Sequence, residues 1–360
     1  MKRLRVRLIQ VGFVLGFWNG VFLPAPTQAA SARPELRILT YDSLAAPGGL
    51  GPEVVRRFEE KCGCRVRLLG VGDSGLLVAR LRMDEERRKT SAHLVWGVDR
   101  WLWPKIQQYS EPAGSWQPER WNQIDPDYRG SVGFEGFLPF DGGALSLIID
   151  RKHPGSQGIP GKISLGKLPS EIFRKQLILE DPRTSGPGLA LERLSRQVFP
   201  DSSAYAEFWR GLRSHWLALF PGWSGAYGAF LKGEAPVVWS YFSSLAYHRA
   251  KAPQDASRYE AILFEEGQPL QVEGAFLVKG AFQSSPETLE LARRFLNFLL
   301  SDEVQKEVPG KNWMLPVIRG TPLPAEFQKL PKPVRFLRLD GVAGVPRGGE
   351  FDAWLRAVQL

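Results

Sequence analysis

Short apolar runs alternate with helical patterns along the first part of the chain. Val54, Val55 and Phe58 recur with the spacing of one helix face, and Gly63 ends that pattern before the next strand-like run. A strand, a helix and a second strand in this order form a βαβ unit, which indicates a parallel sheet covered by helices. The predicted elements of this part are strands at 36–41, 65–69 and 93–97 and helices at 52–62 and from 74 to about 81.

The pattern changes near Phe140. A glycine-rich step at 140–143 leads into an apolar run at 144–149, and a stretch rich in Pro and Gly follows at 154–161. Such a stretch is typical of a chain that crosses between two lobes. A second α/β series then begins. Its predicted elements are strands at 176–180, 236–241 and 275–279 and helices at 188–198, 204–215 and 286–308.

A chain that leaves one α/β lobe and later returns to it predicts a ligand cleft between the lobes. We assign residues 34–140 and 271–360 to the first lobe and residues 141–270 to the second. The length of 360 residues exceeds the roughly 100–200 residues of an ordinary domain, which fits this division.

Residues 1–30 have the pattern of a signal peptide. Four basic residues between positions 2 and 7 precede an apolar stretch at 11–23, and small residues at 27–30 suit cleavage near Ala30. The apolar stretch is shorter than the roughly 20 residues that a membrane span needs. We therefore predict a periplasmic protein, with an uncleaved anchor as the less favoured alternative.

Charge and composition argue against several classes of function. Loss of residues 1–30 lowers the formal net charge from +9 to +5, and the remaining basic residues are mixed with acidic ones, as at 80–89. The sequence has no stripe in which basic residues alternate with aromatic ones, so nucleic-acid binding is disfavoured. The four His share no metal-ligand spacing, and neither a Gly-x-Ser-x-Gly motif nor a phosphate-binding loop occurs. We predict no catalytic residues, metal or cofactor.

Cys62 and Cys64 are the two cysteines of the chain. Export permits a bond between them, although the loop that it closes is very small. A redox or metal role needs further ligands that the sequence does not supply. A structural or incidental pair is therefore favoured over a functional one.

Aromatic and small polar residues gather where the predicted strands end. Tyr41 follows the first strand and Asp73 the second, while Tyr241 ends the strand at 236–241 and Tyr247 lies shortly beyond it. Ligands of α/β sheets bind outside the carboxyl ends of strands, where loops converge. Aromatic rings at that edge stack on flat ligands and attract cations, and a carboxylate adds charge pairing.

Other aromatic residues divide between the core and this edge. Trp223 and Trp313 adjoin turn residues and are the better ligand candidates, whereas we assign Trp96, Trp209 and Trp216 to the core. Ser185 precedes the helix predicted at 188–198. A helix-cap role and an anion-binding role are equally supported there, because helix N-termini serve both.

Several segments resemble the periplasmic thiamine-binding proteins of ABC importers. EDPRTSGPG at 180–188 is shared more widely with related iron- and small-molecule-binding proteins, whereas GWSGAYGAFLKGE at 222–234 is much more specific. The Cys-x-Cys pair also resembles one in that family. The similar segments keep the family's order, span nearly all of the chain beyond residue 30, and lie at 39–43, 81–83, 137–141, 180–188, 222–234, 240–241, 246–248 and 312–317.

The resemblance implies an α/β, two-lobed type II periplasmic binding protein fold with a ligand cleft between the lobes. It also implies thiamine or thiamine phosphates as the ligand and an inner-membrane ABC permease as the partner, and we expect a monomer. By motif position, the implied ligand-binding residues are Tyr41, Asp73, Ser185, Trp223, Tyr241, Tyr247 and Trp313.

The chain departs from the family pattern after Ser43. The family commonly places a Trp in the following loop, and residues 44–50 contain none. The phosphate or mouth side of the pocket is therefore expected to differ, and the choice among thiamine, its monophosphate and its diphosphate stays open.

Two alternatives stay open as well. One is a protein of the same fold that binds ferric iron or a phosphonate. The other is a thiamine-degrading enzyme with a Cys nucleophile, for which Cys62 and Cys64 are poorly placed.

Overall fold

The computed structural model describes residues 33–130, 134–283, 285–331, 335–339, 349 and 351–359 of the 360-residue chain. The predicted signal peptide, residues 1–30, lies outside the described residues. Among the described residues, no helix has the length and apolar character needed to cross a membrane.

Strands and helices alternate along the chain. The strands are β1 (Glu35–Thr40), β2 (Arg65–Gly70), β3 (Leu94–Asp99), β4 (Leu138–Asp150), β5 (Lys162–Ile163), β6 (Leu177–Glu180), β7 (Trp216–Phe220), β8 (Val237–Tyr241), β9 (Tyr259–Phe264), β10 (Gln268–Leu277), β11 (Leu315–Pro316) and β12 (Phe336–Leu337). The helices are α1 (Asp42–Ala45), α2 (Leu50–Cys62), α3 (Ser74–Glu86), α4 (Trp103–Ile106), α5 (Pro126–Arg129), α6 (Gly186–Val198), α7 (Ser202–Arg213), α8 (Trp223–Leu231), α9 (Ser244–Lys251), α10 (Pro286–Leu299), α11 (Asp302–Gln305), α12 (Val308–Lys311), α13 (Ala325–Gln328) and α14 (Asp352–Val358).

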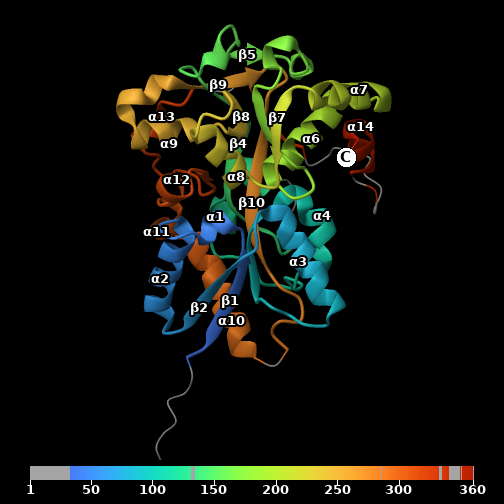
Figure 1. The fold of residues 1–360 in the computed structure, drawn as a ribbon. Helices are drawn as coiled ribbons and strands as arrows, with labels where there is room; N and C mark the ends of the chain where they lie inside the picture. Colours follow the sequence, from blue (N-terminus) through green and yellow to red (C-terminus); the bar gives the residue numbers. More distant parts are fainter. Residues whose placement is uncertain are drawn as a thin grey trace, which may run out of the picture. The chain divides into compact units, whose positions relative to one another are not determined.

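The sheet has two halves that share the long strand β4. Along the sheet the order is β2-β1-β3-β10-β4-β8-β6-β7. The first half-sheet consists of β2, β1, β3, β10 and the start of β4, and the second consists of the end of β4 with β8, β9, β6 and β7. Figure 1 shows the first half with α2, α3 and α10 in its lower part and the second half with α6, α7 and α9 above.

Local sequence explains how the first βαβ unit forms. Val54 and Phe58 bury one face of α2, and Gly63 ends the helix in the left-handed conformation (φ 64°), with its N–H donating to the Glu59 carbonyl. The chain then enters β2, which pairs in parallel with β1 from Arg65 onward. The predicted βαβ unit is confirmed.

Two predictions about the elements are wrong. The sheet is mixed instead of parallel, because the long strand β10 runs antiparallel to both β3 and β4. The helix predicted at 286–308 is three helices. The first ends at Leu299, the Ser301 hydroxyl then caps the start of α11, and α12 begins at Val308 with Pro309 in its first turn.

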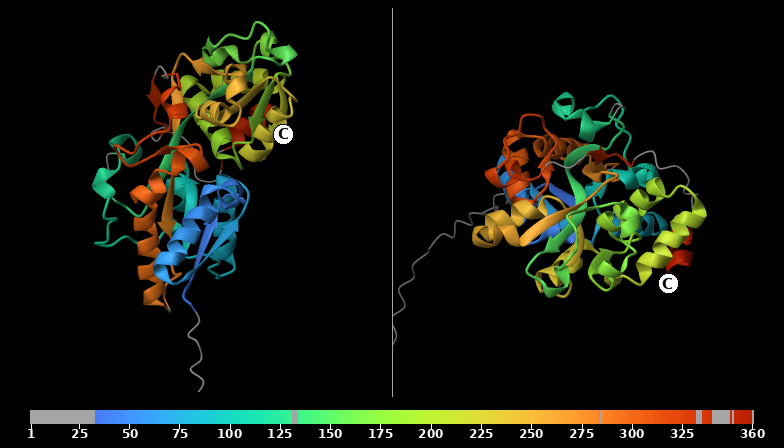
Figure 2. Two further views of the ribbon diagram at one scale, coloured as in Figure 1. Left: turned by 90° about the vertical axis from the view of Figure 1, so that its left-hand side faces the viewer. Right: turned by 90° about the horizontal axis from the view of Figure 1, so that it is seen from above.

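Segments far apart in the sequence pack together. In the side view of Figure 2, α2 and α10 lie side by side in the lower part. The short helices α13 and α14 pack on α9 and α7, which belong to the segment that the sequence assigned to the second lobe. The lobe boundaries at 140/141 and 270/271 fall inside β4 and β10, and the division into 34–140, 141–270 and 271–360 stays a prediction.

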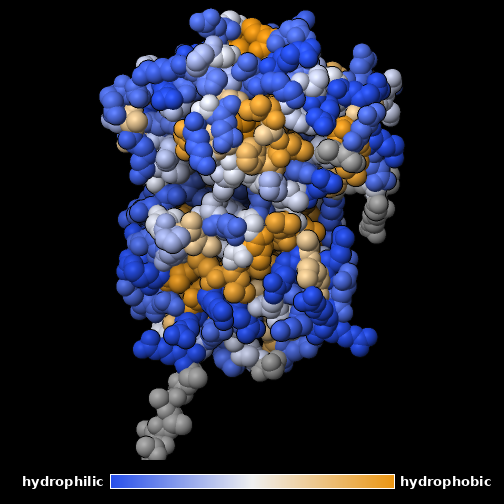
Figure 3. All heavy atoms as spheres, in the orientation of Figure 1, coloured by the Kyte–Doolittle hydropathy of each residue, from blue (hydrophilic) through white to orange (hydrophobic). Residues whose placement is uncertain are grey.

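The core contains the three Trp residues assigned to it. Trp96, Trp209 and Trp216 are all buried, and Trp96 packs edge-on against Phe140 with ring centroids 5.0 Å apart. The face drawn in Figure 3 is mostly polar, with apolar residues grouped over both the upper and the lower part. The predicted α/β class is confirmed, and both half-sheets supply loops to the cavity described next.

Candidate functional site

A cavity of about 300 Å³ lies where loops of the two half-sheets meet. Tyr41 and Asp73 reach it from the loops after β1 and β2, and Glu273 reaches it from β10. Trp223 at the start of α8, Tyr241 at the end of β8 and Trp313 after α12 line the cavity as well. Five of the seven predicted site residues therefore line one cavity: Tyr41, Asp73, Trp223, Tyr241 and Trp313.

Tyr41 is held in place by its ring and by its hydroxyl. Gly97 (φ 93°) leaves the space for the ring, since a Cβ atom at this position would lie 2.3 Å from Tyr41 Cε1. The Tyr41 hydroxyl donates to Glu273 Oε2 at 2.8 Å and accepts from Asn312 Nδ2 at 3.1 Å. Burial, followed by the nearby carboxyl groups, raises the pKa of Tyr41, so the phenol stays neutral at the cavity.

Asp73 caps α3 and reaches across to α8. One carboxyl oxygen accepts from the Ser74 N–H at 2.6 Å and the other from the Trp223 N–H at 3.0 Å. Burial raises the pKa of Asp73, and these backbone hydrogen bonds oppose that rise. Asp73 therefore ties the β2–α3 loop to the start of α8 at the edge of the cavity.

Trp223 is fixed by aromatic and polar contacts. Its indole stacks on Tyr227 with centroids 5.0 Å apart and an interplanar angle of 18°, and it meets Tyr241 edge-on at 6.1 Å. The indole N–H donates to Ser240 Oγ at 2.8 Å. Because the ring is restrained on several sides, it forms a rigid wall of the cavity.

Trp313 has a left-handed backbone (φ 57°), which is uncommon for a residue with a large side chain. Ser243 Oγ donates to the Trp313 carbonyl at 2.5 Å and helps to hold this conformation. Tyr247 does not line the cavity. Its ring meets the Trp313 ring edge-on at 5.1 Å and thus supports Trp313 from behind.

Ser185 is buried outside the cavity lining. It is the N-cap of α6, and its hydroxyl accepts from the Gly188 N–H at 3.4 Å. The Ser185 hydroxyl also opposes the rise in the pKa of Asp73, so the two side chains are near each other. The helix-cap role is present.

Sequence reasoning missed Glu273, a buried carboxyl at the cavity. Gln271 Nε2 donates to Glu273 Oε1 at 3.2 Å, and the Tyr241 hydroxyl donates to Gln271 Oε1 at 3.1 Å. The available signal was a charged residue in the run Val272-Glu273-Gly274-Ala275, where an apolar side chain is expected. The predicted strand at 275–279 began too late to include it, because β10 starts at Gln268.

Comparison with known proteins establishes the family. A model of the bacterial extracellular solute-binding proteins matches residues 107–341. The chain belongs to this family. The thiamine-binding periplasmic protein of Escherichia coli K12 is 36% identical over 336 residues, which cover 92% of this chain and 96% of the relative. That of Brucella abortus is 35% identical over 311 residues, covering 86% of this chain and 87% of the relative.

The solved structure of a periplasmic thiamin-binding protein has the same fold as this solute-binding protein. Its TM-score is 0.78 at 34% identity, and the match covers 91% of this chain and 96% of that one. The predicted two-lobed periplasmic binding protein fold is confirmed.

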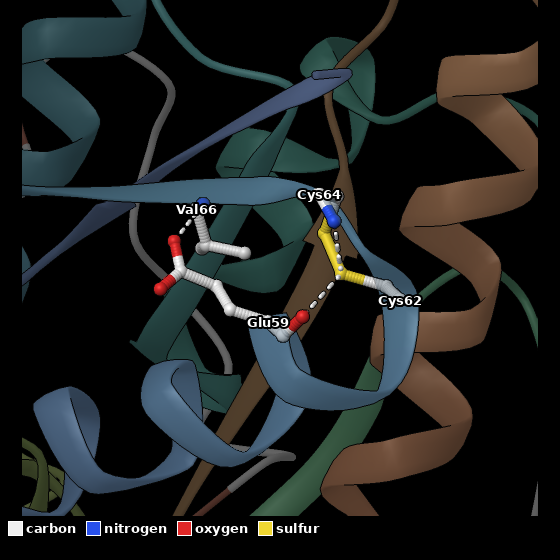
Figure 4. Close-up of a disulfide and its surroundings, with 4 residues drawn as sticks. All are labelled: Glu59, Cys62, Cys64 and Val66. Atoms are coloured by element: carbon white, nitrogen blue, oxygen red, sulfur yellow. Dashed lines mark hydrogen bonds between the residues drawn. A yellow bond between two sulfur atoms is a disulfide. The ribbon is translucent and has the colours of Figure 1, made fainter.

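The cysteine pair of this solute-binding protein is a disulfide between Cys62 and Cys64. It lies at the turn between α2 and β2, where Glu59 also accepts a hydrogen bond from the Val66 N–H at 2.7 Å (Figure 4). Neither cysteine lines the cavity. The pair therefore closes a structural turn at a distance from the aromatic wall.

The cavity combines aromatic faces with carboxyl groups. Trp223, Tyr241 and Trp313 present rings that can stack on a flat heteroaromatic ligand, and Asp73 and Glu273 supply negative charge or hydrogen-bond acceptors. Ring faces and carboxylates both favour a cation. The chemistry of the cavity thus fits a flat, positively charged organic solute.

Proposed function

We propose that this solute-binding protein captures thiamine in the periplasm and delivers it to an ABC permease of the inner membrane. The observation that carries the proposal is the cavity walled by Trp223, Tyr241 and Trp313, in a chain about 35% identical to proteins named for thiamine binding. Thiamine has a flat aminopyrimidine ring and a permanently cationic thiazolium ring. Both rings suit a cavity of aromatic faces and carboxyl groups.

The seven residues predicted from the sequence keep distinct proposed roles. Trp223, Tyr241 and Trp313 stack on or enclose the ligand rings, and Tyr41 and Asp73 accept or donate hydrogen bonds at their edges. Tyr247 supports Trp313, and Ser185 acts beside Asp73 at the start of α6, nearest to a hydroxyethyl or phosphate end of the ligand.

The proposal includes how the protein works as a carrier. The lobes, 34–140 with 271–360 and 141–270, close over the ligand, and the closed monomer docks on the permease. Residues 1–30 direct export. The protein performs no catalysis, in keeping with relatives that are named as binding proteins.

The alternatives that the sequence left open lack specific support. A thiamine-degrading enzyme with a Cys nucleophile needs a thiolate, and Cys62 and Cys64 are joined in a disulfide. In the described part of the chain, no three or more His, Cys, Asp or Glu side chains form a group suited to a metal ion. Metal analysis of the purified protein tests the ferric alternative directly.

Titration of the Trp fluorescence with thiamine, its monophosphate and its diphosphate tests the proposal. We expect saturable quenching by at least one of them. Trp223→Phe and Trp313→Phe should each remove part of the quenching and weaken binding, since indole offers the larger stacking face and is the strongest cation–π partner among the aromatic side chains.

Trp116→Phe is the matched control. Trp116 packs against Phe134 and lies under Arg293, outside the cavity lining, so its replacement should leave the affinity unchanged. Failure of all three thiamine compounds to bind, or equal effects of the three substitutions, would refute the proposal.

A further inference from the structure

Three acidic residues form a row across the middle of the first half-sheet. Glu273 on β10 pairs directly with Asp99 on β3 on one side and with Asp141 on β4 on the other. Directly paired residues of neighbouring strands point to the same face of a sheet, with Cβ atoms about 4.5–5.5 Å apart. We call Asp99, Glu273 and Asp141 the acidic row. All three side chains are buried, and Glu273 is the member that lines the cavity.

The surroundings of the acidic row favour neutral carboxyl groups. Burial, together with the neighbouring carboxyl groups, raises the pKa of Glu273, and burial is the main cause that raises the pKa of Asp99 and of Asp141 to about 7. Like charges placed directly opposite each other in a sheet repel, so the row resists carrying three negative charges. Among the described residues, no ion pair involves Glu273.

The groups that face Glu273 come from every element packed around it. Tyr41 after β1 donates to its Oε2 atom, and Gln271 on β10 donates to its Oε1 atom. Asp73 from the β2–α3 loop acts on Glu273 as a further negative charge. The titratable and charged groups in and around the row are Tyr41, Asp73, Asp99, Asp141, Tyr241 and Arg193. The positive charge of Arg193 lowers the pKa of Asp99 and so partly opposes the effect of burial.

We propose that Glu273 determines specificity for a cationic ligand by exchanging its proton for that ligand. In the empty cavity the carboxyl group of Glu273 is protonated. When the cation enters, the O–H bond of Glu273 breaks, its proton passes to the solvent, and the carboxylate pairs with the positive charge. This inference rests on the proposed function, since it takes thiamine as the cation.

The direction of the pH dependence follows from this exchange. The pKa of Glu273 is raised in the empty protein and lowered by the bound cation, so the complex binds fewer protons than the empty protein. Thiamine affinity should therefore rise with pH, by up to about tenfold per pH unit while the empty protein is still protonated, and then level off. A neutral ligand would show no such rise.

Titration calorimetry in buffers of different ionisation enthalpy counts the protons exchanged per thiamine bound. Between about pH 5 and about pH 8, we expect the wild-type protein to release up to one proton per ligand. Glu273→Gln, which keeps the size of the side chain but cannot ionise, should release none. It should bind thiamine about 30-fold or more weakly at the upper end of this range, and the difference from wild type should shrink as the pH falls.

Glu180→Gln is the matched control. Glu180 is also buried with a raised pKa, yet it lies at the end of β6 outside the cavity lining, so this variant should release protons as the wild type does. The number of protons that the wild-type protein releases per thiamine bound tests the inference even if a variant fails to fold.

Four outcomes decide the matter. Proton release by the wild type that is lost in Glu273→Gln and kept in Glu180→Gln supports the inference. Thiamine binding without proton exchange, or with proton uptake, refutes this inference while leaving the proposed function intact. Proton release that persists in Glu273→Gln also refutes it. Absence of thiamine binding at every pH refutes the proposed function, and the inference with it.

Discussion

Replacement of Gly97 by Ala should damage the site through Tyr41. The added Cβ atom would lie 2.3 Å from Tyr41 Cε1, whereas carbon atoms in contact are about 3.5–4.0 Å apart. The Tyr41 ring must therefore move by about 1 Å. Such a movement breaks or weakens the hydrogen bonds that its hydroxyl makes with Glu273 and Asn312.

The expected loss of stability is the sum of a backbone contribution and a hydrogen-bond contribution. The positive φ of Gly97 costs a residue with a Cβ atom about 1 kcal/mol. Two lost hydrogen bonds cost about 1 kcal/mol each, which brings the loss to about 3 kcal/mol. Thiamine affinity should fall about tenfold or more, because Tyr41 and Glu273 both line the cavity and move apart.

Gly48→Ala separates the two contributions. Gly48 also has a positive φ (78°), but a Cβ atom there meets nothing within 4 Å, so this variant should lose only about 1 kcal/mol and bind thiamine normally. Urea unfolding followed by Trp fluorescence measures the stability, and calorimetry measures the affinity. If Gly97→Ala matched Gly48→Ala in both measurements, the close contact between Gly97 and Tyr41 would be disproved.

Two further variants test whether Ser243 positions Trp313 and whether the disulfide influences the cavity. Ser243→Ala removes the donor to the Trp313 carbonyl and should weaken thiamine binding about fivefold with little change in melting temperature, and an unchanged affinity would contradict a positioning role for Ser243. Joint replacement of Cys62 and Cys64 by Ser should lower the free energy of unfolding by at most about 2 kcal/mol, since the closed loop is very small, and should leave thiamine affinity within about twofold in calorimetry. A large loss of affinity would show that the disulfide acts on the cavity.

The sequence predicted the local elements of the first βαβ unit closely because their signals are local. The apolar face of α2 and the glycine that ends it are contiguous in the chain, and β1 and β2 were located within a residue or two. The antiparallel direction of β10 has no local signal. It follows from pairing with β3 and β4, strands separated from β10 by more than 100 residues of sequence.

The residues of the candidate site likewise fall into those that local sequence predicted and one that it did not. The residues taken from strand ends and motifs, such as Tyr41 and Trp223, do line the cavity, and their part in ligand binding stays a proposal. Glu273 escaped notice because a single glutamate in a strand has no motif, and its importance arises from Asp99 and Asp141 beside it on neighbouring strands. The run at 272–275 shows a charged residue in an apolar setting, but its two acidic neighbours come only from the tertiary pairing of the strands.

The long strand β4, which both half-sheets share, has a mechanical consequence. Any rotation of one half against the other must be absorbed as backbone twisting within β4, because this strand continues from one half into the other. The pairing of β10 with β4 shifts register between Glu273 and Gly274, and an irregular pairing yields more easily than a regular ladder. The irregular pairing and Glu273, which lines the cavity, thus lie at the same point of the sheet, so a ligand that contacts Glu273 would also contact the stretch best able to twist.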